Sequence, residues 1–131
     1  LRLNTRRAMV VHGLDGLDEI STTAPTQVSE VVDGKILSYL IDPAEYGLPI
    51  AALDDISGGT PEQNADIVLG ILQGKRGARR DLVLLNAAAA LVVADKAENI
   101  REGMIFAARS IDSGAAQAKL DRMRELTRQS A

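Results

Sequence analysis

The chain has 131 residues, a net charge of −3 and no cysteine, which fits one domain without a disulfide framework or a thiolate metal site. Two tyrosines and one phenylalanine are its only aromatic residues, so this acidic chain lacks the basic, ring-bearing surface that nucleic-acid binding requires. Its longest apolar run, residues 82–94, is too short to cross a bilayer, and no signal-peptide pattern opens the chain, so we expect a cytoplasmic protein with no membrane partner.

An apolar run near the start of the chain opens into an acidic loop. Residues 7–11 show no polar alternation, which predicts a strand buried on both faces, as in parallel sheets. The strand ends near Gly13, and Asp15, Asp18 and Glu19 follow its carboxyl end, where open α/β sheets bind ligands. The adjacent carboxylates of Asp18 and Glu19 can both reach one Mg²⁺. Solvated turn and capping residues have the same spacing, so spacing alone leaves both interpretations open.

Asp33 and Gly34 separate two alternating runs and predict a β-hairpin with a type I′ turn, because both central residues of that turn need a positive φ. The turn fixes a register with the pairs Val28–Tyr39, Glu30–Leu37 and Val32–Lys35. One face of the hairpin is apolar enough for the core, and we expect the other face, with Ile36 and Leu40, to be partly covered as well. We interpret the hairpin as sheet scaffold.

Capping residues predict one short helical turn and three long helices. Their predicted caps are Asp42, Thr60, Asp81 and Asn99. A break at Gly114 then separates a last helix. Residues 82–94 are apolar at nearly every position, which predicts a helix buried on all sides, with Asn86 in need of buried hydrogen-bond partners. The alanine run at residues 87–90 predicts close packing against a neighbouring element.

Three connecting segments carry weaker signals. Residues 48–56 are predicted to be a connector with solvated acidic residues. Gly58 and Gly59 can cradle phosphate, but neither the dinucleotide fingerprint nor the Walker sequence is present, so we interpret them as a helix entry. The basic cluster at residues 75–80 is typical of a solvated loop, and an anionic ligand or an acidic surface is the alternative.

These elements predict an α/β fold: part of a central mixed sheet, made of one buried strand and a hairpin, packed by about four helices. A parallel-type first strand and a helix that is apolar on all sides require more covering layers than the chain supplies. The chain begins at Leu1 without an initiator methionine. We therefore expect part of the sheet and a helical partner to lie upstream.

Several motifs together resemble one enzyme family. They are the stretch 11–21 (VHGLDGLDEIS), the hairpin ending in Asp42–Pro43, the Gly58–Gly59 helix entry, the stretch 85–91 (LNAAAAL) and the stretch 111–116 (IDSGAA). In this order they are similar to the carboxyl-terminal part of the anthranilate phosphoribosyltransferases, from about residue 7 to the end of the chain. The resemblance implies a nucleoside phosphorylase/phosphoribosyltransferase-like fold that is incomplete here, with residues 1–131 as one domain and the amino-terminal helical domain absent.

The resemblance also implies a reaction and a metal. The family transfers a phosphoribosyl group from phosphoribosyl pyrophosphate to anthranilate in tryptophan biosynthesis, as a homodimer. Its acidic pair binds Mg²⁺, which assigns Asp18 and Glu19 as metal ligands, with Asp15 as an outer-shell helper. His12 is interpreted as a structural residue at the strand end.

The chain also departs from the family pattern. The glycine-rich pyrophosphate loop, the Lys-His-Gly-Asn segment and the arginine that meets the anthranilate carboxylate have no counterpart in the sequence. We therefore assign no catalytic and no substrate-binding residue, and we expect the chain alone to be inactive. Two alternatives stay open: a relative of the pyrimidine-nucleoside phosphorylases, which the acidic loop disfavours, and a non-catalytic scaffold or binding domain of the same fold.

Overall fold

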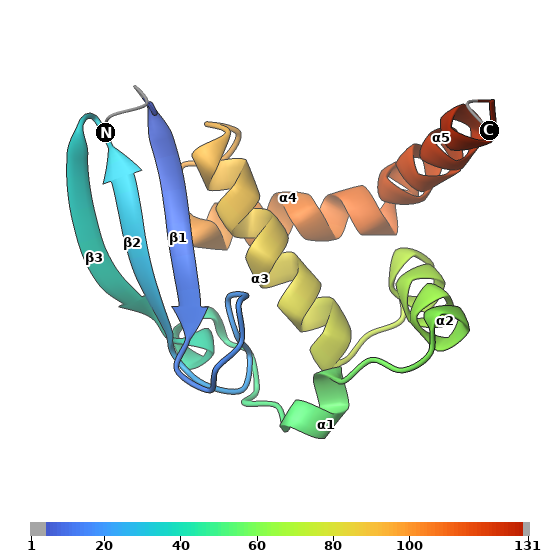
Figure 1. Cartoon of the computed structure of the whole chain (residues 1–131), viewed down its shortest axis with the longest axis horizontal. Helices are drawn as coiled ribbons and strands as arrows, with labels where there is room; N and C mark the ends of the chain where they lie inside the picture. Colours follow the sequence, from blue (N-terminus) through green and yellow to red (C-terminus); the bar gives the residue numbers. More distant parts are fainter. Residues whose placement is uncertain (1–4, 130–131) are drawn as a thin grey trace.

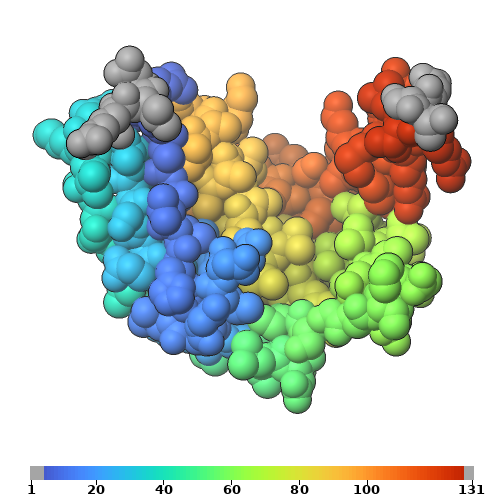
Figure 2. Space-filling model, in the orientation of Figure 1, coloured from blue at the N-terminus to red at the C-terminus, as the bar shows by residue number. Residues whose placement is uncertain are grey.

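The computed structural model of the chain describes residues 5–129 and combines a three-stranded sheet with helices that pack against one of its faces (Figure 1). The elements, in chain order, are β1 (Arg7–Gly13), β2 (Thr26–Val32), β3 (Lys35–Ile41), the 3₁₀ helix η1 (Pro43–Tyr46), α1 (Leu53–Ile56), α2 (Pro61–Leu72), α3 (Ala78–Val93), α4 (Ile100–Asp112) and α5 (Ala115–Gln129). The space-filling view shows a hollow between α5 on one side and α3 on the other (Figure 2). The α/β class and the four long helices are therefore confirmed.

The hairpin has the predicted register. β2 and β3 pair antiparallel, with Val28 opposite Tyr39 and Val32 opposite Lys35. The turn residues Asp33 and Gly34 have φ values of 49° and 73°, as a type I′ turn requires. Local turn chemistry is therefore enough to set this part of the sheet.

The position of β1 differs from the prediction. β1 pairs only with β2, and the pairing is antiparallel, so the sheet in the described residues is antiparallel throughout rather than mixed. Val10 is 71% exposed, and Ile36 and Leu40 on the same outer face are 59% and 53% exposed. The prediction of two covered faces was wrong for this structure, because the helices pack only against the inner face, where Val28 lies.

The core lies between the sheet and α3. Leu85 and Ala88 of α3 are fully buried and belong to the same cluster as Val28 of β2 and Ile100 of α4. The predicted close packing of the alanine run is confirmed at Gly103 of α4, where an added Cβ would lie 2.8 Å from the Ala88 Cα atom. α3 therefore touches both the sheet and α4 with its small residues.

α3 begins earlier than predicted and is not buried on all sides. It starts at Ala78, with Gly77 as its N-cap, so Asp81 lies in its first turn and does not cap it. Arg80 is only 2% exposed, whereas Val83 is 41% exposed. The basic segment expected as a solvated loop thus contributes its last residues to a helix, and Arg80 donates a hydrogen bond to Asp112 of α4.

The other helix boundaries follow the predicted caps. Thr60 and Asn99 accept the N–H groups of the third residues of α2 and α4, and Asp42 caps η1. The short helix α1 was not predicted; the Asp55 carboxylate accepts the Ala52 N–H at 3.0 Å and stabilises its start. No helix in the described part of the chain is both long and apolar enough to cross a membrane. The predicted domain bounds include residues 1–4 and 130–131, which lie outside the described residues.

Candidate functional site

The acidic loop that follows β1 is closed by its own backbone. The Gly13 N–H donates to the Leu17 carbonyl at 2.8 Å, and the Leu14 N–H donates to the Pro25 carbonyl at 2.9 Å. An added Cβ at Gly13 would lie 2.4 Å from Oδ1 of Asp15 and 3.2 Å from the Leu17 carbonyl oxygen. Glycine is therefore required where the strand turns into the loop.

The Asp15 carboxylate holds the loop from inside. Its Oδ2 accepts the Ser21 hydroxyl at 2.5 Å and also the Thr23 hydroxyl, and its Oδ1 accepts the Leu17 N–H at 3.1 Å. Burial raises the pKa of Asp15, but hydrogen bonds from the Ser21 and Thr23 hydroxyls and from backbone N–H groups together outweigh it and leave the pKa below its ordinary value. Asp15 is thus ionised, and both of its carboxylate oxygens accept hydrogen bonds that stabilise the loop.

Asn86 of α3 anchors the other end of the loop. Its Oδ1 accepts the Ile20 N–H at 2.9 Å, and its Nδ2 donates to the Ile20 carbonyl at 2.8 Å and to the Leu82 carbonyl at 3.0 Å. Ile20 itself is 1% exposed. The predicted need of Asn86 for partners is met, and these bonds fix the backbone directly after Glu19.

Asp18 and Glu19 lie side by side in the chain between these two anchors. Both are exposed, and neither carboxylate makes a hydrogen bond or ion pair with any residue in the described range 5–129. Within that range no three histidine, cysteine, aspartate or glutamate residues group closely enough to hold a metal by themselves. Two free carboxylates on an ordered loop suit a hard cation that keeps some waters and takes further oxygens from a substrate.

The other candidates from the sequence are His12 and the Gly58–Gly59 segment. His12 is exposed on β1 opposite Gln27. The Gly59 N–H donates to Oδ1 of Asn64, a residue of α2, at 2.8 Å. This N–H group is therefore already paired and is not available to a phosphate. The Gly58–Gly59 segment is therefore a helix entry, as interpreted.

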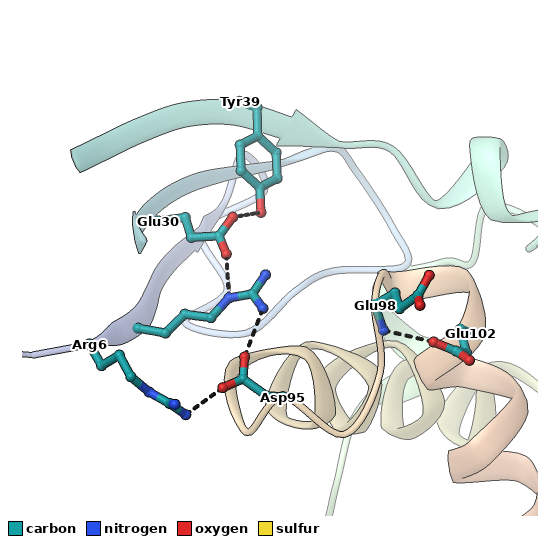
Figure 3. Close-up of polar contacts among 7 residues, drawn as sticks. Arg6, Glu30, Tyr39, Asp95, Glu98 and Glu102 are labelled. Atoms are coloured by element: carbon teal, nitrogen blue, oxygen red, sulfur yellow. Dashed lines mark hydrogen bonds and ion pairs between the residues drawn. The ribbon is translucent and has the colours of Figure 1, made fainter. Parts of the chain in front are cut away.

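An ion-pair network that the sequence analysis missed ties the sheet to the α3–α4 turn (Figure 3). Glu30, 6% exposed, accepts the Arg7 Nε–H and the Tyr39 hydroxyl, both at 2.9 Å. Arg7 also donates to Asp95 at 3.3 Å. Burial raises the pKa of Tyr39, and its hydrogen bond to Glu30 raises it further. The one sequence signal was Glu30 itself, on the apolar face of the hairpin.

Comparison with known proteins shows the family to which the chain belongs. The family profile described as "Glycosyl transferase family, a/b domain" matches residues 1–117. The chain belongs to this glycosyl transferase family. Among the curated relatives of the chain, the anthranilate phosphoribosyltransferase of Thermoanaerobacter sp. (strain X514) is 52% identical over 128 residues, which are 98% of this chain and 38% of the relative.

Solved structures of the same fold also match the chain. The anthranilate phosphoribosyltransferase from Thermus thermophilus aligns with a TM-score of 0.79 and 37% identity over 88% of this chain and 34% of its own. The enzyme from Saccharomyces cerevisiae in complex with PRPP and Mg aligns with a TM-score of 0.78 and 29% identity over 86% and 33% of the two chains. The chain thus spans little more than a third of the relatives it matches.

Proposed function

We propose that this chain is part of an anthranilate phosphoribosyltransferase and supplies its metal-binding acidic pair, Asp18 and Glu19. The complete enzyme transfers the phosphoribosyl group of phosphoribosyl pyrophosphate (PRPP) to the nitrogen of anthranilate, a step of tryptophan biosynthesis. The observation that carries the proposal is the pair of free carboxylates on a braced loop at the end of β1. By the same resemblance we propose that the complete enzyme is a cytoplasmic homodimer.

The two carboxylates of Asp18 and Glu19 suit a Mg²⁺ ion that is also bound by the phosphate oxygens of a substrate. Mg²⁺ is usually bound by one or two carboxylates and completes its shell with waters and substrate phosphates, so two acidic residues without a third are sufficient. The Saccharomyces cerevisiae relative was solved with PRPP and Mg. Because most of the shell must come from substrate and water, we expect the pair to bind a metal weakly when PRPP is absent.

The chemistry explains why free carboxylates matter at this position. Displacement at the anomeric carbon of ribose places positive charge on the sugar and negative charge on the departing pyrophosphate. Mg²⁺, when bound, neutralises charge on the pyrophosphate. Asp18 and Glu19 hold the ion, while Asp15 and Asn86 are positioning residues that fix the backbone on either side of the pair.

The acidic pair also separates the transferase from the alternatives. Phosphorolysis of pyrimidine nucleosides uses inorganic phosphate and needs no metal clamp on pyrophosphate, so free carboxylates here favour the transferase. A non-catalytic scaffold of the same fold requires no metal at Asp18 and Glu19. Metal binding at this loop is therefore the property to measure.

Paramagnetic broadening by Mn²⁺ tests the site in the 131-residue chain. We expect substoichiometric Mn²⁺ to broaden the amide NMR signals of residues 17–20 first, and excess Mg²⁺ to reverse the effect. The double variant Asp18→Asn/Glu19→Gln should lose this local broadening. Asp54→Asn, which removes an exposed carboxylate in α1, should keep it. Broadening that persists in the double variant, or that spreads evenly over the acidic surface, would contradict the assignment.

A further inference from the structure

A cavity of about 470 Å³ lies where α2 leads into α3. Four basic side chains line it, Lys75, Arg76, Arg79 and Arg80, against two acidic ones, Asp55 and Asp66. None of these residues belongs to the acidic loop. The lining therefore has an excess of positive charge in a place that the proposed function does not use.

Arg80 is the unusual member of this lining. Its side chain is 2% exposed, and its NH2 group donates to Oδ1 of Asp112 at 2.7 Å. Its Nε and NH1 atoms are buried and have no hydrogen-bond partner in residues 5–129, and the same holds for Nε of Arg79. A buried guanidinium with unsatisfied N–H groups costs free energy, and an anion with several acceptor oxygens would relieve that cost.

The first residues of α3 add backbone N–H donors to the lining of this cavity. Gly77 is the N-cap and offers no capping side chain. The first hydrogen bond into the helix runs from the Asp81 N–H to the Gly77 carbonyl at 3.1 Å, so the N–H groups of Ala78, Arg79 and Arg80 have no partner within the helix. The N-terminus of a helix of this length favours a bound anion. Ala78, Arg79 and Arg80 all line the cavity.

We propose that this cavity, the α3 anion site, binds an inorganic oxyanion of the phosphate type. Tetrahedral phosphate presents oxygens in several directions and carries up to two charges at neutral pH, which suits a cavity lined by both the first residues of a helix and guanidinium side chains. A carboxylate has only two oxygens and one charge, and Asp112 already supplies one on the Arg80 side. The proposal is independent of the proposed function.

A titration of the 131-residue chain with inorganic phosphate, followed by amide NMR at constant ionic strength, tests the site. We expect saturable shifts at Gly77, Ala78, Arg79 and Arg80. Shifts that stay linear in concentration and scatter over exposed basic residues would overturn the proposal. Sodium acetate is the comparison: acetate that saturates the same signals with equal affinity would overturn the assignment to a phosphate-type anion.

Matched variants separate this site from general surface charge. The double variant Lys75→Gln/Arg76→Gln removes two exposed basic residues of the lining, and we expect phosphate affinity to fall by about tenfold. Arg122→Gln/Arg124→Gln removes the same charge from exposed positions of α5 and should leave the affinity unchanged. Equal affinity in the wild type and the Lys75/Arg76 variant would contradict the site.

Arg80→Lys tests the buried guanidinium itself. Lysine keeps the charge but lacks the Nε and NH1 donors, so we expect at least the same loss of phosphate affinity with a retained fold. If the variant fails to fold, the decisive readout is thermal unfolding: phosphate should raise the midpoint of the wild type and not that of the Lys75/Arg76 variant. An equal rise in both would overturn the proposal.

Discussion

At the level of single residues, the acidic loop is held by the Asp15 carboxylate, which accepts hydrogen bonds from Ser21, Thr23 and Leu17. Its pKa in the folded chain lies below the ordinary value of 3.8. The ionised group therefore stabilises the fold at pH values above that ordinary pKa, and the contribution is lost as the pH falls through the lowered folded pKa.

Asp15→Asn tests this linkage. The variant should be less stable than the wild type near neutral pH, and the difference in free energy of unfolding should shrink between about pH 5 and pH 2 as the wild-type carboxylate becomes protonated. Denaturant unfolding at several pH values measures the difference. Asp54→Asn serves as the control, because the Asp54 carboxylate makes no hydrogen bond in the described residues. A difference that stays constant down to the lowest pH would show that Asp15 is not an ionised brace.

The residues of the site were predictable to different degrees. The loop position of Asp18 and Glu19 after the first strand was predictable, because it depends only on local sequence. Their role as metal ligands came only from the family resemblance and stays a prediction. The bracing role of Asp15 was not predictable, since its partners Ser21 and Thr23 are set by the path of the loop. The burial of Arg80 was missed as well, because a basic cluster usually stays in solvent and only the contact with Asp112, 32 residues away, draws the side chain inside.

At the level of elements, α3 and α4 cross at a point where only small residues fit. An added Cβ at Gly103 would lie 2.8 Å from both the Cα and the carbonyl oxygen of Ala88. Gly103→Ala should therefore destabilise the chain by about 1–3 kcal/mol in spite of the better helix propensity of alanine. Thermal or denaturant unfolding measures the change.

Gly70→Ala is the matched control for this prediction. Gly70 also lies in a helix, but its added Cβ would meet no atom closer than 3.5 Å. The variant should be neutral or more stable by up to about 1 kcal/mol. Equal effects of the two substitutions would mean that the crossing of α3 and α4 is not tightly packed.

Elements whose boundaries depend on local chemistry were predicted well. Asp33–Gly34 gave the hairpin register, and Thr60 and Asn99 gave the starts of α2 and α4. The start of α3 was wrong because Gly77 offers no capping side chain to recognise. The prediction that both faces of β1 are covered failed for a different reason. Whether a strand is covered depends on layers that are distant in the sequence, and an apolar run such as residues 7–11 does not specify them.

At the level of the whole molecule, the chain is a three-stranded sheet with helices on one face. The other face of the sheet is apolar and uncovered, and a hollow lies beside α5 (Figure 2). It spans 38% of the Thermoanaerobacter relative and 34% of the Thermus thermophilus structure. We propose that the remaining part of the enzyme supplies the substrate-binding groups for which this sequence offers no counterpart. The chain alone should then show no turnover of anthranilate and PRPP.

The most direct test is a fluorescence assay of anthranilate consumption with the product of the whole gene, with PRPP and Mg²⁺ present. We predict turnover for the wild type and a fall in kcat/KM of about 100-fold or more for Asp18→Asn/Glu19→Gln, with Asp54→Asn close to wild type. The isolated 131-residue chain should give none. A whole-gene product without activity, or a double variant with wild-type activity, would contradict the account of this acidic pair as the metal site of a phosphoribosyltransferase.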